Sequence, residues 1–140
     1  PDGFITSELE RVAVYHRLVN FTDLEQIENL NEELRYRFGK LPVDVERFLL
    51  AIQLKVLAGK MLADRLILKK GELKLFFSEQ AQDDEYFFKT QIPKMMNQDM
   101  AKISFINQEK LGVHIFLKGR EQLEQMAFAK KVLQFVAGDE

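Results

Sequence analysis

An apolar stripe that ends at a glycine constrains this chain most. Apolar residues recur every three or four positions from Leu24 to Phe38, so they lie on one face of a helix. Gly39 suits the end of that helix, because a C-terminal cap often needs a left-handed backbone conformation. Pro42 then fits the first turn of a following helix, where its missing N–H costs no hydrogen bond. The chain should therefore contain a helix, a short turn and another helix. The stripe consists of Leu24, Ile27, Leu30, Leu34 and Phe38.

Capping patterns and periodicity define the helices of the N-terminal half. Ser7 with Glu10 forms a capping box that begins a first helix running to about Asn20. Thr22 with Glu25 repeats the pattern at the start of the second helix. The third helix is expected from Pro42 to about Met61 and is apolar on two sides, which indicates a central position. The residues expected inside are Phe48, Leu49 and Ile52.

The period of the pattern changes after Ala63, which predicts strands. Apolar residues alternate around Lys70-Gly71, as in a β-hairpin. Residues 83–97 predict a helix broken near Pro93, and a second strand pair is expected at 102–106 and 111–117. A last helix follows Gly119. The predicted fold class is α+β: three N-terminal helices, a β-hairpin, a short broken helix, a second strand pair and a C-terminal helix around one core.

The size and composition of the chain exclude several protein classes. Its 140 residues form one expected domain, 1–140, and their 46% hydrophobic and 30% charged content is typical of a folded globular protein. The absence of cysteine excludes disulfides and thiol chemistry and fits a reducing, cytoplasmic setting. A net charge of −2 opposes general binding of polyanions, and no apolar run is long enough to span a membrane. The start at Pro1 indicates a piece of a longer protein.

The motifs of common catalytic and cofactor sites are missing. Gly59-Lys60 lacks the glycine and hydroxyl residue of a phosphate-binding loop, and no dinucleotide-binding glycine pattern occurs. His16 and His114 lie on separate predicted elements without metal-ligand spacing. The carboxylates of residues 83–85 are expected to favour a helix start rather than catalysis. We therefore predict no catalytic, cofactor or metal site in this chain.

Two charged surfaces are candidates for binding a partner. The hairpin at Lys69 and Lys70 is basic, and either contacts nucleic-acid phosphates or protects a sheet edge from pairing with another chain. The second helix carries acids off its apolar stripe, in a region where residues 1–46 hold 10 acids and 5 bases. There, Glu33 either pairs with Arg37 on its own helix or takes part in an acidic docking surface.

The turn between the second and third helices resembles a known family signature. Residues 33–42 read ELRYRFGKLP and are followed by Val45 and Leu49-Leu50. They resemble E-L-x-D-R-F-G-x-L-P-x-x-V-x-x-L-L in the C-terminal domain of bacterial transcription-repair coupling factors (Mfd). The opening residues 1–5 and 11–18 also resemble the start of that domain. The likeness is specific over residues 1 to about 60, and Tyr36 stands where the family has an acid.

The resemblance implies a regulatory domain cut from a larger multidomain protein of the bacterial cytoplasm. The family's parent is an ATP-dependent DNA translocase that removes stalled RNA polymerase from double-stranded DNA and recruits UvrA for nucleotide excision repair. Its ATP and Mg²⁺ belong to motor domains elsewhere, so no enzyme activity or cofactor is expected in this chain. The C-terminal domain clamps the parent's N-terminal UvrB-like module and masks its UvrA-binding surface, which is a form of autoinhibition.

The site implied by this role lies on the second helix. Glu33 aligns with the acid that opens the family signature, and it lies off the apolar stripe. We therefore predict an interface with the UvrB-like module at Glu33, with Glu32, Tyr36 and Arg37 beside it. The alternative function is a nucleic-acid-binding module that uses the basic hairpin around Lys69 and Lys70.

Overall fold

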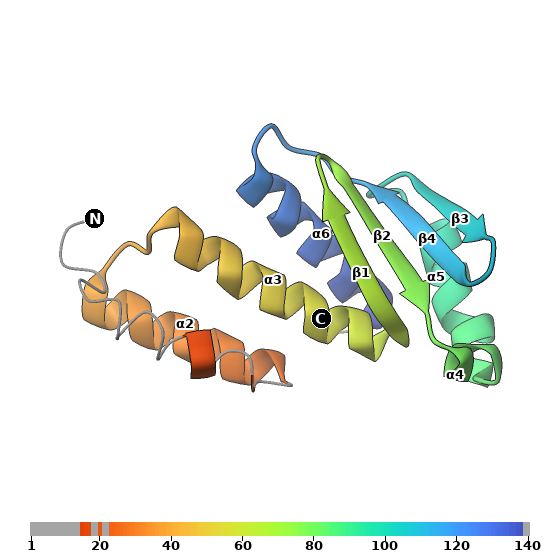
Figure 1. Ribbon diagram of the computed structural model, residues 1–140, viewed down its shortest axis with the longest axis horizontal. Helices are drawn as coiled ribbons and strands as arrows, with labels where there is room; N and C mark the ends of the chain where they lie inside the picture. Colours follow the sequence, from red (N-terminus) through yellow and green to blue (C-terminus); the bar gives the residue numbers. More distant parts are fainter. Residues whose placement is uncertain (1–14, 18–19, 21–22, 139–140) are drawn as a thin grey trace. The chain divides into compact units, whose positions relative to one another are not determined.

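The computed structural model describes residues 15–17, 20 and 23–138, which form an α+β fold (Figure 1). The chain divides into two compact units, Pro1–Val56 and Leu57–Glu140. The first contains α2 (Leu24–Phe38) and most of α3 (Val43–Lys60). The second contains the four strands and the remaining helices. The predicted fold class and order of elements are confirmed.

The start of the chain is described in part only. Residues 15–17 are helical, as predicted, whereas the rest of the expected first helix, with its capping box at Ser7 and Glu10, lies outside the described residues. The cap of α2 is Asp23, one residue after the predicted Thr22. The Asp23 side chain accepts a 2.9 Å hydrogen bond from the N–H of Glu25, because an Asp oxygen at this position reaches a free amide of the first turn.

Apolar side chains of α2 and α3 form the core of the first unit. The predicted stripe lies inward, with Ile27, Leu30 and Leu34 buried. Gly39 ends α2 with the predicted positive φ, 80°, and its N–H donates to the carbonyl of Arg35. Helix α3 contributes the predicted core residues Leu49 and Ile52. Phe48 was also predicted inside but is only partly buried, and the centroid of its ring lies 4.5 Å from that of Tyr15. The buried cluster is Ile27, Leu30, Leu34, Leu41, Val45, Leu49 and Ile52.

The second unit is built on a four-stranded antiparallel sheet in the order β1-β2-β4-β3. The strands are β1 (Ala63–Lys69), β2 (Glu72–Phe77), β3 (Ile103–Asn107) and β4 (Leu111–Phe116). The hairpin of β1 and β2 turns at the predicted position, where Gly71 has a φ of 68°. At this angle glycine pays no steric penalty, which explains why the turn forms there. Both predicted strand pairs are confirmed.

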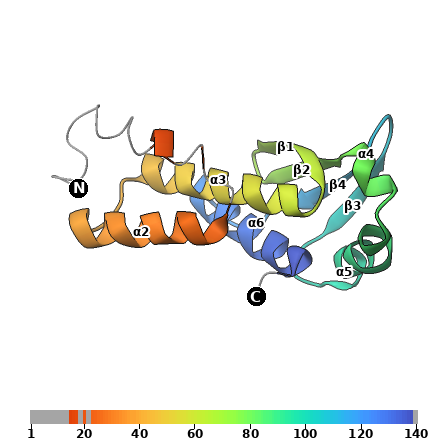
Figure 2. The same cartoon turned by 90° about the horizontal axis from the view of Figure 1, so that it is seen from below.

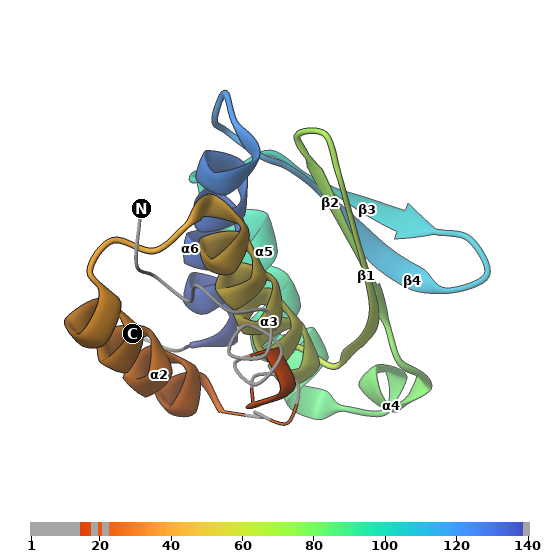
Figure 3. The ribbon, with the colours of Figure 1, turned by 60° about the vertical axis from the view of Figure 1, so that its left-hand side comes forward.

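One face of the sheet packs against helices of the second unit. The alternating residues Leu73, Leu75 and Phe77 of β2 are buried, as are Val113 and Ile115 of β4. Figures 2 and 3 show α5 (Ile92–Asn97) and α6 (Gln122–Ala137) on the same side of the sheet. The sheet therefore supplies an apolar floor for these helices, and residues of the other parity, such as Lys74 and His114, lie on the opposite face.

The helix predicted over 83–97 is interrupted before its proline. A short helix, α4 (Glu79–Gln82), comes first, and Asp84 then accepts a 2.8 Å hydrogen bond from the N–H of Phe87. Residues Phe87–Gln91 form a wide π turn, η1, directly before α5, in which Pro93 lies in the first turn. Proline lacks an N–H and its ring crowds the carbonyl four residues earlier, so a wider turn relieves the contact. The predicted break is confirmed, and it takes this π-helical form.

The last helix follows a glycine at a position that leaves no room for a side chain. Gly119 has a φ of 131°, and a Cβ there would lie 2.8 Å from that of Glu124. Glu121 and Glu124 form a capping box at the start of α6. The buried face of α6 includes Met126, Val132, Leu133 and Val136, whereas Ala127 and Phe135 are exposed.

Candidate functional site

Helix α2 presents the four predicted interface residues away from its buried stripe. Glu32 and Tyr36 are four residues apart and lie opposite Leu34, on the side of the helix farthest from its buried stripe. Glu33 and Arg37, also four apart, lie on the flank beside them. The structure therefore brings these residues together in one patch, which we call the α2 surface (Glu32, Glu33, Tyr36 and Arg37).

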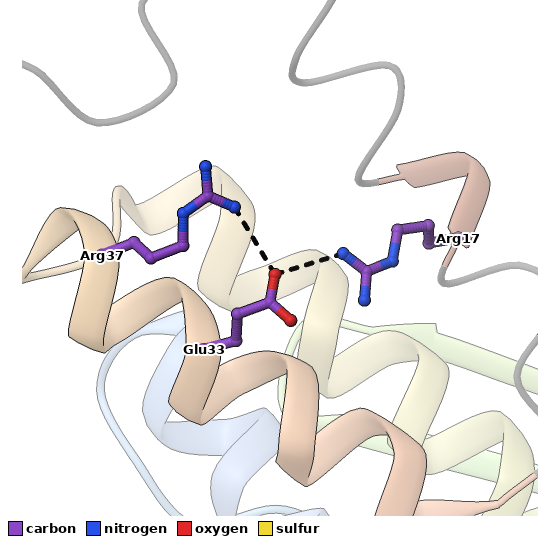
Figure 4. Close-up of polar contacts among 3 residues, drawn as sticks. All are labelled: Arg17, Glu33 and Arg37. Carbon is purple, nitrogen blue, oxygen red and sulfur yellow. Dashed lines mark hydrogen bonds and ion pairs between the residues drawn. The ribbon is translucent and has the colours of Figure 1, made fainter.

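The carboxylate of Glu33 is shared between two arginines (Figure 4). Glu33 Oε2 lies 3.3 Å from Nη1 of Arg17 and 3.6 Å from Nη1 of Arg37. The Arg37 pair is the expected pair within the helix, and the Arg17 pair joins α2 to the described segment before it. The side chain of Glu33 is 40% exposed, so solvent screens these pairs and leaves one side of the carboxylate accessible.

A second polar network lies on the other flank of α2. Arg35 Nε donates a 3.1 Å hydrogen bond to Asn31 Oδ1, and its Nη2 lies 3.6 Å from Glu46 Oε1 on α3. The buried Gln53 of α3 donates to Glu28 Oε1 over 2.5 Å. Two of these contacts connect the helices of the first unit: Arg35 to Glu46, and Gln53 to Glu28.

The side chain of Tyr36 is almost fully exposed on the α2 surface. Its exposed fraction is 92%, and its neighbour Arg37 instead places its guanidinium over the ring of Phe38, 4.9 Å from the centroid. The exposed fraction of Tyr36 is the highest among the large apolar and aromatic side chains that the structure describes as exposed. The ring offers apolar area and the hydroxyl offers one donor and one acceptor. An arrangement of this kind is suited to contact with a protein surface.

Comparison with known proteins places this chain in a family. A sequence model of the TRCF domain matches residues 1–87, well over half of the chain. The chain belongs to the TRCF domain family. The α2 surface lies within the matched part of this TRCF domain, and the predicted family resemblance is confirmed.

Curated proteins with similar sequences are named transcription-repair-coupling factors. Those of Rickettsia bellii and Rickettsia typhi are each 27% identical over 66 residues, and that of Rickettsia prowazekii is 26% identical over the same length. The aligned part is 47% of this chain and 6% of each relative, so the TRCF domain spans a small fraction of the proteins it matches.

A solved structure shares the fold over the full length of the domain. The crystal structure of a C-terminal domain of transcription-repair coupling factor matches with a TM-score of 0.73 at 17% sequence identity. The match covers 100% of this chain and 88% of that one. At this low identity the likeness shows the fold, and it extends beyond residue 87, where the match to the family's sequence model ends.

Other residues singled out in the sequence have ordinary contacts in the TRCF domain. His114 Nε2 lies 2.5 Å from Glu72 Oε1 and its ring stacks on Phe116, on the open face of the sheet. Among the acids at 83–85, the side chain of Asp84 accepts a hydrogen bond from the N–H of Phe87, and Glu85 forms an ion pair with Lys89. Among residues 15–17, 20 and 23–138, histidine and acidic side chains form no group of three that would hold a metal ion. The same part of the chain contains no helix with the length and apolarity of a membrane span.

Sequence reasoning missed two partners of the α2 surface region. Arg17 reaches Glu33 across sixteen positions, and Arg35 reaches Glu46 across eleven. Neither spacing follows a helical repeat, so only the folded arrangement reveals these pairs. The Glu33–Arg37 pair, in contrast, could be predicted from the sequence, because residues four apart on a helix lie side by side.

Proposed function

We propose that this TRCF domain is a regulatory interaction domain that docks on the N-terminal UvrB-like module of its parent protein. In this role the α2 surface contacts that module and masks its UvrA-binding surface. The observation that carries the proposal is Tyr36, which is 92% exposed beside Glu33 and Arg37. Tyrosine and arginine are enriched among residues that dominate the energy of protein interfaces. The names of the curated relatives support the setting in transcription-coupled repair.

The ion pairs of Glu33 suit a reversible contact. Arg17 and Arg37 both contact Oε2 of Glu33, and the side chain is 40% exposed, so the carboxylate can exchange these weak pairs for an arginine of the partner. An interface between domains typically buries about 600 to 1,500 Å² and is fairly polar. Within such an area, one charged pair has a measurable effect on the closed state while the contact stays weak enough to open.

The strength of the masking contact determines how much the apparent affinity for UvrA should change when the contact is broken. If the closed form dominates by a few kcal/mol, loss of about 2 kcal/mol at one pair raises the open population about thirtyfold. Glu33→Arg in the full-length parent should therefore increase the apparent affinity for UvrA by up to that factor. Tyr36→Ala should act in the same direction, because it removes an exposed ring that has no role in the core. Titration of labelled UvrA against each variant measures the effect.

The matched control is Glu109→Arg, the same charge change at an exposed position in the turn between β3 and β4 of the second unit. It should leave UvrA affinity unchanged. A compensating Arg→Glu change on the UvrB-like module should restore masking with Glu33→Arg. If Glu33 serves only its pairs with Arg17 and Arg37, both Glu33→Arg and Tyr36→Ala will leave UvrA affinity at the wild-type value, which would contradict the proposal.

The remaining activities proposed for the parent reside outside this chain. In this proposal, ATP hydrolysis with Mg²⁺, translocation on double-stranded DNA and displacement of stalled RNA polymerase belong to motor domains elsewhere in the parent. The isolated TRCF domain should therefore give no saturable heat on titration with Mg-ATP. Saturable binding would assign a nucleotide site to this chain and revise that division of roles.

A further inference from the structure

The turn of the β1–β2 hairpin is fixed beside the start of α6. The N–H of Gly71 donates a 3.0 Å hydrogen bond to Gln125 Oε1, and the N–H of Leu117 donates to the carbonyl of Gly71 over 2.8 Å. Gln125 Nε2 in turn donates to the carbonyl of Gly119. Figures 1 and 3 show the hairpin tip and the beginning of α6 at the same end of the second unit. These segments therefore form one pre-organised surface.

A hollow of about 440 Å³ lies between these segments, and the charged residues that line it in the described structure are basic. We call it the basic hollow: its cations are Lys69 and Lys70 from the hairpin and Arg120 from the loop before α6. Leu68 and the buried Met126 give it an apolar part, while Gln122 and Gln125 supply carboxamides. Among the residues that the structure describes, none of those that line it carries a carboxylate. Such a lining is complementary to a ligand that carries both negative charge and an apolar group.

The cations of the basic hollow lack acidic partners in the part of the chain that the structure describes. No carboxylate of residues 15–17, 20 or 23–138 lies within ion-pair distance of Lys69, Lys70 or Arg120. The nearby acids have other contacts, since Glu72 lies against His114, and Glu124 accepts from the N–H groups of Arg120 and Glu121. The start of α6 is thus capped by its own side chains, so the three cations, and not the helix terminus, define the site.

We propose that the basic hollow binds an acidic segment of a partner protein, with carboxylates on Lys69, Lys70 and Arg120 and an apolar side chain against Leu68 and Met126. The domain's net charge of −2 and pI of about 5.8 oppose a long polyanion such as nucleic acid, which gains affinity from many phosphate contacts. A short acidic segment meets only the local positive charge. The proposal concerns the second unit and is independent of the masking role of the α2 surface.

Fluorescence anisotropy with the complete chain tests the proposal. The probe is a short fluorescein-labelled peptide in which glutamates flank leucines, and its control carries glutamine in place of glutamate. We expect saturable binding of the first peptide only, weakened as NaCl rises from about 50 to about 300 mM because the screening length falls. Lys69→Glu with Lys70→Glu, and separately Arg120→Glu, should raise the Kd by at least about tenfold. Circular dichroism checks that each variant is folded.

The matched control is Lys131→Glu, the same charge change at an exposed position of α6 away from the hollow. It should change the Kd by less than about twofold, because a distant surface charge is screened. Equal weakening by Lys131→Glu, equal binding of the glutamine peptide, or no binding of the glutamate peptide would overturn the proposal. So would tighter, hollow-dependent binding of single-stranded oligo(dT), which would assign the site to nucleic acid. UvrA affinity of the parent should not respond to these variants, so this proposal and the masking proposal can fail separately.

Discussion

The two compact units of this domain hold together in different ways. In the first unit, buried side chains such as Leu30 and Leu34 join two helices, and surface charges pair with one another. In the second unit, backbone ladders join four strands, and the cations of the basic hollow have no acidic partner within the described part of the chain. Both units bury apolar side chains, so a loss of side-chain volume should destabilise either of them, but the sheet depends in addition on the close approach of its backbones at Gly112. Added volume at that position should therefore damage the sheet in particular.

Removing volume from the first unit should have the largest effect. Ile52→Ala should lower the free energy of unfolding by about 2 to 5 kcal/mol, because Ile52 is 8% exposed and its truncation leaves a cavity in the cluster. Urea denaturation followed by circular dichroism measures the change. Lys55→Ala, an exposed change on the same helix, should cost less than about 0.5 kcal/mol. A loss below about 1 kcal/mol for Ile52→Ala would contradict the central position of α3.

Adding volume to the sheet should have a smaller but clear effect. A Cβ at Gly112 would lie 2.5 Å from the carbonyl oxygen of Leu75 and 2.9 Å from Cδ1 of Phe76. Gly112→Ala should therefore cost about 1 to 3 kcal/mol by forcing β2 and β4 apart, as seen in the same urea titration.

The same substitution at Gly59 provides the control for Gly112→Ala. Gly59 lies in α3, and no atom comes within 4 Å of a Cβ placed there. Gly59→Ala should stabilise the domain by about 0.5 kcal/mol, because alanine loses less backbone entropy in a helix. If both changes have the same sign, close backbone approach does not limit the sheet as we describe.

Breaking one surface ion pair should have the smallest effect. Arg17→Ala removes the 3.3 Å contact with Glu33, but both side chains are at least 40% exposed. The cost should be about 0.5 kcal/mol or less at low salt and should vanish near 1 M NaCl. Thermal unfolding at the two salt concentrations measures it. A cost that persists at high salt would indicate that Arg17 contributes by packing rather than by charge.

Local features of the fold could be read from the sequence. The hairpin at Lys70-Gly71 and the end of α2 at Gly39 both follow from a positive φ at a glycine, a property of one residue and its neighbours. The stripe of α2 follows from periodicity in the same way. Pro93 did not predict the π turn at Phe87–Gln91, because a proline removes one backbone hydrogen bond of the helix without determining which other backbone conformation forms in its place.

Depth of burial and long-range pairs could not be read in this way. Phe48 was expected inside and is only partly buried, because periodicity gives the side of a helix but not the extent of its cover. The candidate residues of α2 were placed together correctly by their spacing, whereas the contact of Arg17 with Glu33 depends on how separate segments fold together. Arg120 likewise joins Lys69 and Lys70 only because the loop before α6 meets the hairpin.

The π turn also affects the register of the helix that follows it. A wide turn holds one residue more than an α turn, and one residue rotates all later side chains by about 100° around the axis. With one residue fewer, Met96, now 66% exposed, would occupy the place of the buried Met95. Met95 would in turn occupy the place of Lys94, so each methionine would move by one position and a methionine would still fill the core. This segment of the sequence could therefore lose a residue and keep the same type of side chain buried.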